Sequence, residues 1–252
     1  KVMGKNKTIA KNVTTTISEN RSGSRPFVSV ICPTFNRRKF LPNLMKQFNY
    51  QTYPQQFMEL IILDDSPTSN ADIILQQSNI KYTYLDEKLL LGAKRNHLNS
   101  LVTGDIVVCF DDDDYYAPER VAHAVTKLQS GSAKIAASSI IHIYYKNLNK
   151  ILEFGPYAPN HGTNGTMAYK ASYLKDHSYL ADKEKAEEAH FTNNFSEPLI
   201  QLDPQKTMIC LAHDNNTVNK DPFIEKGKMT SHKLSGFFKT KNKEMLEWIK
   251  NE

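Results

Sequence analysis

Residues 105–114 read DIVVCFDDDD, an apolar strand that runs directly into four aspartates. Adjacent carboxylates repel one another, so they remain at the end of a buried strand only where cations neutralise them. Hard divalent cations take oxygen ligands and often bridge a protein to a phosphorylated substrate. A solvated acidic turn is the alternative, and a buried strand leading straight into the aspartates disfavours it. The run therefore predicts a metal site at a strand end.

The size and composition of the chain are those of a soluble globular protein. Its 252 residues predict one large domain with an appendage, and the hydrophobic share of 40% and charged share of 23% are ordinary for such a fold. No apolar run approaches the roughly 20 residues of a membrane helix, and the amino terminus lacks the apolar middle of a signal peptide. We therefore expect a cytoplasmic protein without an integral membrane segment, and leave open peripheral membrane association and loss of an anchor by truncation.

The net charge of +5 lies entirely in residues 1–25, which hold six basic residues and one acidic residue. The rest of the chain has 26 of each sign and is neutral. A basic tail on a neutral body is typical of a solvated leader, with an anion-binding arm as the alternative. A nucleic-acid-binding protein would need basic residues on its folded body, so we expect no nucleic-acid partner. Cys32, Cys109 and Cys210 lie in apolar runs without metal-ligand spacing, which predicts buried thiols.

From Pro26 onward the hydrophobic pattern alternates between strands and helices. We expect strands at 27–32, 57–63, 80–85 and 106–110, and helices at 41–48, about 69–77, from Gly92 to before Gly104, and from Pro118 to about 128. Strands that alternate with crossover helices imply a mostly parallel sheet covered on both faces. The fold class is therefore predicted to be α/β, with a Rossmann-like central sheet flanked by helices.

After Gly131 the pattern is less regular. We expect strands at 134–145 and 150–154, a turn and strand at 162–169, a polar helix at 181–193 and a strand at 207–212. A helix in the tail carries Phe238, Met245, Trp248 and Ile249 along one face, which predicts packing on its own domain.

Polar clusters follow three of the expected strands, at 33–36, 64–65 and 111–114. Ligands of parallel α/β sheets bind in the crevice outside the carboxyl ends of the strands. The three clusters are therefore expected to converge on one crevice.

The chain resembles family 2 glycosyltransferases, which have the GT-A fold. The matching stretches are VSVICPTFNR at 28–37, ILDDS at 62–66, GAKRN at 92–96, and FDDDD at 110–114 followed by YAPER at 116–120. They cover about residues 26–130 in the order usual for the family. The resemblance implies a nucleotide-sugar donor and transfer with inversion at the anomeric carbon.

The resemblance also implies which residues hold the nucleoside of the donor. Pro33 and Phe35 would line the base pocket, Asp65 would accept a hydrogen bond from the base, and Arg95 would lie near the donor. Core packing is the alternative for Phe35, and a helix cap is the alternative for Asp64 or Asp65. The alternative for Arg95 is a surface cation.

The aspartate run matches the Asp-x-Asp signature of the family. By resemblance, Asp112 would lie near the ribose and Asp113 would bind Mn²⁺ or Mg²⁺, with Asp111 in direct or water-mediated support. Asp114 would cap the following turn. His213, at the end of an expected strand, would be a further metal ligand as in several GT-A enzymes; a core or loop histidine is the alternative. The charged middle residue leaves open which carboxylate is the direct ligand.

Glu187-Glu188 resembles the acidic pair whose second residue is the general base of inverting family members. Glu188 would then deprotonate the acceptor hydroxyl. The alternative is a solvated charged helix, and Glu187 and Asp182 are the other candidates for the base.

These expectations describe a metal-dependent inverting glycosyltransferase. It would move a hexose or deoxyhexose from a UDP sugar to a hydroxyl of a glycan or glycoconjugate. The predicted organisation is a flexible leader at 1–25, a GT-A domain at 26–219 with a nucleotide-binding half (26–130) and an acceptor half (131–219), and a helical extension at 220–252. The alternatives are a nucleotidyltransferase, disfavoured by the glycine-free loop at 33–38, and a non-catalytic nucleotide-sugar-binding module.

Overall fold

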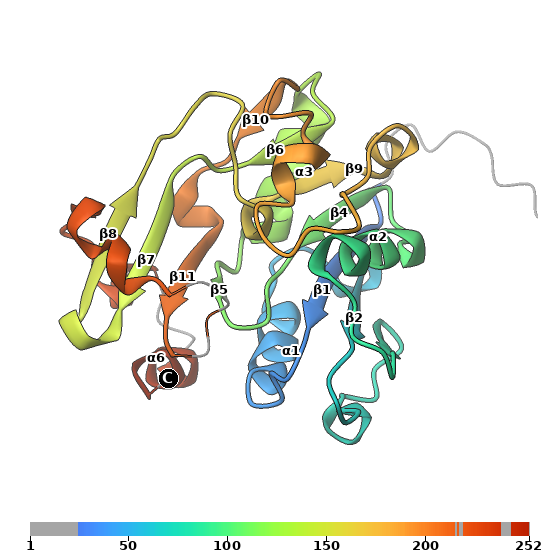
Figure 1. The fold of residues 1–252 in the computed structure, drawn as a ribbon, viewed down its shortest axis with the longest axis horizontal. Coiled ribbons are helices and arrows are strands. Elements are labelled where there is room, and N and C mark those ends of the chain that lie inside the picture. Colours follow the sequence, from blue (N-terminus) through green and yellow to red (C-terminus); the bar gives the residue numbers. More distant parts are fainter. Residues whose placement is uncertain (1–24, 215, 217–218, 238–242, 252) are drawn as a thin grey trace, which may run out of the picture.

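The structure is a computed structural model that describes residues 25–214, 216, 219–237 and 243–251. The predicted leader at 1–25 lies outside these residues except for Arg25. Two sheets form the molecule, and in Figure 1 the second stands to the left of the first.

The first sheet has seven strands in the order β10-β6-β9-β4-β1-β2-β3. Neighbours are parallel from β4 through β1 and β2 to β3, and β10 is parallel to β6, whereas β9 is antiparallel to both β4 and β6. The mostly parallel α/β sheet predicted from the sequence is confirmed. Its strands are β1 (Val28–Thr34), β2 (Met58–Asp64), β3 (Ile80–Tyr84), β4 (Ile106–Cys109), β6 (Ile135–Ala137), β9 (Ala168–Lys170) and β10 (Leu199–Gln201).

Helices cover both faces of this sheet, because alternate side chains of each strand point to opposite faces. On one face, α1 (Leu41–Asn49) and α3 (Arg120–Ser130) bury their apolar stripes against alternate residues of β1 such as Val30. On the other face, α2 (Leu91–Leu101) buries Leu98 in a cluster that includes Ile31. All seven residues of β1 are buried, as expected for a central strand of a covered sheet.

The second sheet, which the sequence did not predict, has five strands in the order β12-β8-β7-β11-β5. These are β12 (Lys228–Met229), β8 (Lys150–Phe154), β7 (Ile141–Tyr145), β11 (Met208–Ala212) and β5 (Tyr115–Tyr116). Residues of α5 (Leu234–Phe237) and α6 (Lys243–Asn251) cover one of its faces, and α6 lies beneath this sheet in Figure 1. Met245 and Ile249 pack there against Tyr144, so the tail helix packs on the rest of the chain as predicted; Phe238 lies outside the described residues.

Three expected elements differ in the structure. The expected strand at 134–145 is two strands in two sheets, β6 and β7, because the chain bends at Ser138, whose Oγ donates to Ile140 O at 2.7 Å. The expected helix at 69–77 is only the 3₁₀ turn η2 (Ala71–Ile73), since Asn70 binds Asp64 and Tyr82 instead of starting a helix. The expected helix at 181–193 shrinks to α4 (Glu188–Phe191), because Ala186 has a left-handed φ of 54°.

The remaining elements are short 3₁₀ turns. They are η1 (Gln55–Phe57), η3 (Lys146–Leu148), η4 (Asn164–Thr166), η5 (Ala171–Lys175), η6 (Pro204–Lys206) and η7 (Asp221–Lys226). Among the described helices, none has the length and apolarity to cross a membrane. The three cysteines are free, and Cys32 and Cys109 are buried as predicted. The division of the chain at residues 25 and 219 stays a prediction.

Candidate functional site

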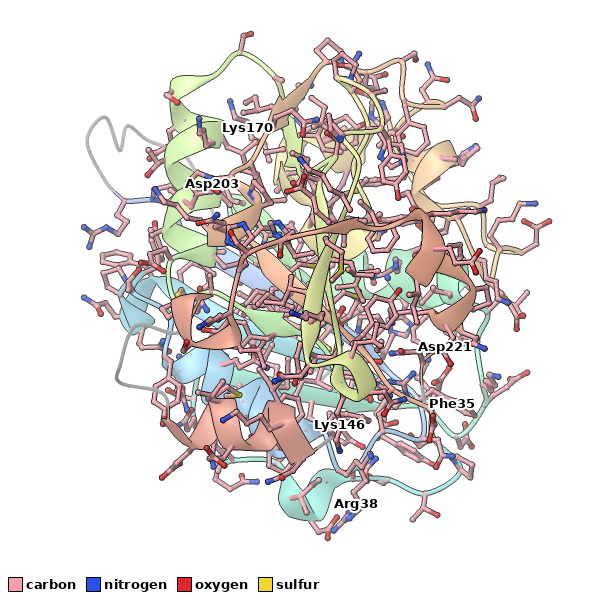
Figure 2. The ribbon with its side chains drawn as sticks, turned by 90° about the vertical axis from the view of Figure 1, so that its left-hand side faces the viewer. Phe35, Arg38, Lys146, Lys170, Asp203 and Asp221 are labelled. Atoms are coloured by element: carbon pink, nitrogen blue, oxygen red, sulfur yellow. The ribbon has the colours of Figure 1, made fainter. Side chains whose placement is uncertain are left out.

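A crevice of about 740 Å³ opens at the carboxyl ends of β1 and β4. The loop at 33–37 and all four aspartates of the run line it, so two of the three predicted polar clusters converge there. Asp64 and Asp65 do not line it. Opposite the aspartates, the second sheet and η7 complete the wall; Figure 2 shows Phe35 and Asp221, the first residue of η7, on the same side of the molecule.

Each aspartate of the run has its own partner. Asp111 accepts from Arg95 Nη2 at 3.3 Å, and Asp112 accepts from Thr34 Oγ1 at 2.6 Å. Asp114 accepts from the backbone N–H of Leu211 at 2.9 Å, which ties the run to β11 rather than capping a turn.

Asp113 is held by three side chains. It accepts a hydrogen bond from Arg37 Nη1, and Asn216 Nδ2 and His213 Nε2 both lie 3.2 Å from its Oδ2. The sequence prediction that cations neutralise the run is therefore met in part by the arginines of the protein itself, Arg37 and Arg95.

The partners separate the pKa values of these carboxyl groups. Burial raises the pKa of Asp114 to about 8, with a further contribution from Asp113. Burial and Asp113 together also raise the pKa of Asp112 well above its usual range. Burial alone would raise the pKa of Asp113, but His213 and Arg37 outweigh it and lower that pKa. Asp113 is thus the carboxyl group of the run that is most firmly ionised.

The side chains at Asp113 fit a divalent ion that takes most of its coordination shell from substrate and water. Within the described residues, no group of three or more His, Cys, Asp or Glu side chains is arranged to hold a metal ion. Asp113 and His213 are a carboxylate–imidazole pair at 3.2 Å, whereas Asp111 is turned to Arg95. Mn²⁺ and Mg²⁺ are commonly held by one or two side chains, with phosphate oxygens and waters completing the shell, so the pair matches such an ion.

The crevice also carries an aromatic ring with two ammonium groups near it. Phe35 is half-buried and joins no hydrophobic cluster, which disfavours the core-packing alternative; Lys88 and Lys94 lie 4.3 Å and 5.6 Å from its ring centre. Asp65 lies behind it, accepting from Lys94 Nζ and, at 2.8 Å, from the N–H of Leu89.

Asp65 is not a helix cap. Its neighbour Asp64 instead structures the turn by accepting from Ser66 N at 2.9 Å and from Tyr82 OH at 2.6 Å. One of the two aspartates thus has a local structural task, as the sequence suggested, although no helix follows it.

The GAKRN stretch at 92–96 joins the two halves of the site. Gly92 N donates to Lys183 O at 2.8 Å, and the Asn96 side chain makes two bonds of 2.8 Å to the backbone of Tyr179. Arg95 is 4% exposed; its Nε donates to Glu187 Oε1 at 2.7 Å while its Nη2 faces Asp111. The surface-cation alternative for Arg95 is therefore wrong.

The acidic pair is split by this arginine. Both glutamates line the crevice, but Glu187 is buried in the ion pair with Arg95, whereas Glu188 is half-buried. Burial raises the pKa of Glu188, and Glu187 adds to the rise. Asp182 is exposed and does not line the crevice. Of the three candidates for the base, Glu188 alone among the described residues combines a crevice position with freedom from an arginine partner.

Sequence reasoning missed three residues of the crevice. Arg37 and Lys94 each lie inside a quoted motif, so their places in PTFNR and GAKRN were the signals that could have found them. Asn164 lies in the irregular second half, beside Gly165, and no sequence pattern marks it.

The arrangement of strands and helices is that of a GT-A fold, and solved structures share it. Staphylococcus aureus TarS 1-349 aligns with a TM-score of 0.60 at 20% identity, covering 74% of this chain and 60% of that one. The mannosyltransferase PcManGT from Pyrobaculum calidifontis, in complex with GDP-Man and Mn²⁺, aligns with a TM-score of 0.61 at 18% identity, covering 77% and 59%.

The chain belongs to glycosyl transferase family 2, whose sequence description matches residues 29–188, well over half of the chain. One curated relative is the GalNAc(5)-diNAcBac-PP-undecaprenol beta-1,3-glucosyltransferase of Campylobacter jejuni, 28% identical over 46% of this chain and 39% of the relative. Another is the putative teichuronic acid biosynthesis glycosyltransferase TuaG of Bacillus subtilis, 30% identical over 38% and 40%. The matches thus span about two fifths of the length of these relatives.

Proposed function

We propose that this protein is a metal-dependent, inverting glycosyltransferase. It takes a hexose, hexosamine or deoxyhexose from a nucleotide-diphosphate sugar, with a UDP sugar as the expected donor, and transfers it to a hydroxyl of a glycan or glycoconjugate. Family membership and the crevice support the proposal. The observation that carries it is that Asp113, whose partner is His213, and Glu188, which has no ion-pair partner among the described residues, line the same crevice.

The crevice offers places for each part of such a donor in order. Pro33 and Phe35 would take the base, with Lys94 and Asp65 as polar partners behind the ring. Asp112 would lie near the ribose, and the diphosphate would reach the far end of the run at Asp113.

Asp113 and His213 would hold Mn²⁺ or Mg²⁺, with Asp111 contributing through water. When bound, the ion supplies positive charge against the diphosphate oxygens as the leaving group departs. Arg37 and Arg95 add fixed positive charge on either side of the run. Because both side chains are largely shielded from solvent, their attraction for phosphate is stronger than it would be in water.

Glu188 would act as the general base. The acceptor oxygen forms a bond to the anomeric carbon while the bond from that carbon to the diphosphate oxygen breaks. The acceptor proton passes to Glu188, and the nucleoside diphosphate leaves with the bonding electron pair. A general base works best when its pKa lies near the working pH, because it is then ionised and still basic enough to accept a proton. The raised pKa of Glu188 moves this group in that direction.

The second sheet would supply the acceptor side. Ile141 and Ile143 of β7 and Phe154 of β8 present an apolar surface to the crevice, and Tyr157 and Phe223 stand at its rim with 56% and 40% exposure. Aromatic rings exposed beside a polar crevice suit the apolar faces of sugar rings. The names of the two relatives given above refer to an undecaprenol-linked saccharide and to teichuronic acid biosynthesis, which is consistent with a glycan acceptor.

We also propose the domain organisation predicted from the sequence: a leader at 1–25, a catalytic domain at 26–219 with its nucleotide-binding and acceptor halves, and an extension at 220–252. A cytoplasmic location is part of the same proposal.

A pair of glutamate variants tests the proposed base. Glu188→Gln is expected to bind UDP as the parent does while kcat for transfer falls by about 10²–10⁴-fold, the usual contribution of a general base. Asp182→Asn, which changes an exposed carboxylate of the same segment, is the control and is expected to keep the parent rate. Binding would be measured by calorimetry and transfer by release of UDP. A parent-like rate for Glu188→Gln would place the base elsewhere.

A further inference from the structure

Two residues that line the crevice each carry a buried polar atom with no hydrogen-bond partner among the described residues. The two atoms are Oδ1 of Asn164, which is 5% exposed, and Nη1 of Arg95, which is 4% exposed. One is an acceptor and the other a donor. A buried polar group without a partner destabilises the protein, so two such groups on residues that line one cavity indicate a ligand that satisfies both.

The position of Asn164 is fixed by its surroundings. Its Nδ2 donates to Tyr179 OH at 2.8 Å, which leaves Oδ1 as the free atom. Asn164 begins the turn η4, and the fully buried Arg120 anchors that turn by donating from Nη2 to Thr166 O at 2.8 Å and Met167 O at 2.7 Å. The next residue, Gly165, lies so close to the aspartate run that an added Cβ would be 2.6 Å from Asp111 Oδ2.

Arg95 reaches the same region from α2. Its Nε and Nη2 are used by Glu187 and Asp111, which hold the guanidinium in place and leave the third nitrogen free. Asp111 therefore lies beside both the arginine and the turn that carries Asn164, so the two residues border the aspartate run.

The chemistry of the pair selects the ligand. An ionised phosphate has no proton to give to Asn164 Oδ1, and the base is expected at Phe35. Sugar hydroxyls both donate and accept, so one hydroxyl can donate to Asn164 while a neighbouring oxygen accepts from Arg95. A site built on such groups rejects a substrate that lacks the hydroxyl, because its own polar atom is then left unpaired.

We propose that Asn164 and Arg95 form the subsite that reads the hydroxyls of the transferred sugar. The donor sugar therefore carries a free hydroxyl at the position that meets Asn164, and a sugar deoxygenated there is rejected. This inference rests on the proposed function and names the part of the donor for which the second half of the chain selects.

The test compares calorimetric affinities for UDP and for UDP sugars. The probes are UDP, UDP-glucose, UDP-galactose, their N-acetylhexosamine counterparts, and the 2-, 3-, 4- and 6-deoxy analogues of the tightest hexose donor, all with Mn²⁺. With the parent protein, at least one deoxy analogue is expected to bind about 10-fold more weakly than the full donor. In Asn164→Ala that difference disappears, while affinity for UDP itself stays within about two-fold.

Asn99→Ala is the matched control. Asn99 lies on α2 outside the crevice, its Nδ2 also has no partner among the described residues, and its Oδ1 accepts from Tyr169 OH at 2.6 Å. This variant is expected to retain the deoxy discrimination. The comparison of donors on the parent protein needs no variant, so it stands even if Asn164→Ala does not fold.

The two possible failures are distinguishable. If UDP binds but no sugar adds affinity and no deoxy analogue binds more weakly, the subsite is refuted while the nucleotide site stands. Discrimination that persists in Asn164→Ala, measured on a protein with a parent-like melting temperature, also refutes the role of Asn164. Absence of binding by UDP and by every UDP sugar would overturn the expected UDP donor and the inference together.

Discussion

A methyl group at Gly92 should disturb both the stability and the activity of the protein. An alanine Cβ at this position would lie 1.9 Å from Leu180 O, whereas ordinary contact begins at 3.4 Å. The start of α2 and the segment at 180–183 must then separate by about 1.5 Å. The obstructing atom is backbone, so no side-chain rotation relieves the contact, and the bond from Gly92 N to Lys183 O is stretched as well.

The energetic cost is that of an overpacked contact, about 1–3 kcal/mol of unfolding free energy. For a chain of 252 residues, 1 kcal/mol corresponds to about 2–4 °C in melting temperature, so Gly92→Ala should melt about 2–12 °C lower. The displaced segment leads directly to Glu187 and Glu188. Because misplacing a reacting group by about 1 Å can reduce the rate by about 10²-fold, kcat for transfer should fall by about that factor.

Thermal melts and initial rates of UDP release would be measured side by side with Gly236→Ala. Gly236 lies exposed in α5, and an added Cβ would meet none of the described residues within 4 Å. Alanine there removes the entropic cost of a helical glycine and should stabilise the protein by about 0.5–1 kcal/mol with no change in rate. Equal melting temperatures and equal rates for Gly92→Ala and the parent would show that α2 and the 180–183 segment are not in the described contact.

Two other perturbations address the base and the acceptor wall. Glu188 must be ionised to accept a proton, and burial and Glu187 raise its pKa above the ordinary value of 4.5. On acidification, kcat should therefore fall around a pKa above 4.5. A rate that is independent of pH down to 4.5 would argue against this base. Tyr157→Ala should raise KM for the acceptor by about 10-fold with KM for the donor unchanged, whereas Tyr50→Ala, which removes a tyrosine of 46% exposure outside the crevice, should alter neither. Unchanged acceptor KM in Tyr157→Ala would remove this ring from the site.

Hydrophobic periodicity was sufficient for four strands and three helices of the first half, but not for the expected helix at 69–77. The strands β1 to β4 and the helices α1 to α3 begin and end within a few residues of their predicted bounds, because their burial patterns are regular and long. The same reasoning failed at 134–145, where the apolar pattern continues through Ser138 although the chain passes from one sheet to the other. Periodicity reports that a residue is buried and does not report in which sheet.

The candidate site divides in the same way. The aspartates, Glu188, His213 and Phe35 were identified from motifs or their order in the chain, and the structure places them around one crevice or directly behind it. Their partners could not be read from the sequence, because they arise from contacts over long separations.

Arg37, for example, is 76 residues from Asp113, and Arg95 is 92 residues from Glu187. Pairing also distinguishes the two glutamates of the crevice, since only the structure shows that Arg95 binds Glu187, while Glu188 has no arginine partner among the described residues. Tertiary contacts thus assigned roles that residue type and spacing left open.

The central claim is that a divalent ion joins Asp113 to the diphosphate of the donor. Calorimetric titration of UDP into the protein, in Mn²⁺ and in chelator, tests it most directly. UDP should bind at least about 10-fold more tightly in Mn²⁺, and Asp113→Asn should lose that gain while keeping the weaker metal-free affinity, since each tenfold step is about 1.4 kcal/mol. Equal UDP affinity with and without Mn²⁺, or a full metal-dependent gain in Asp113→Asn, would contradict the claim.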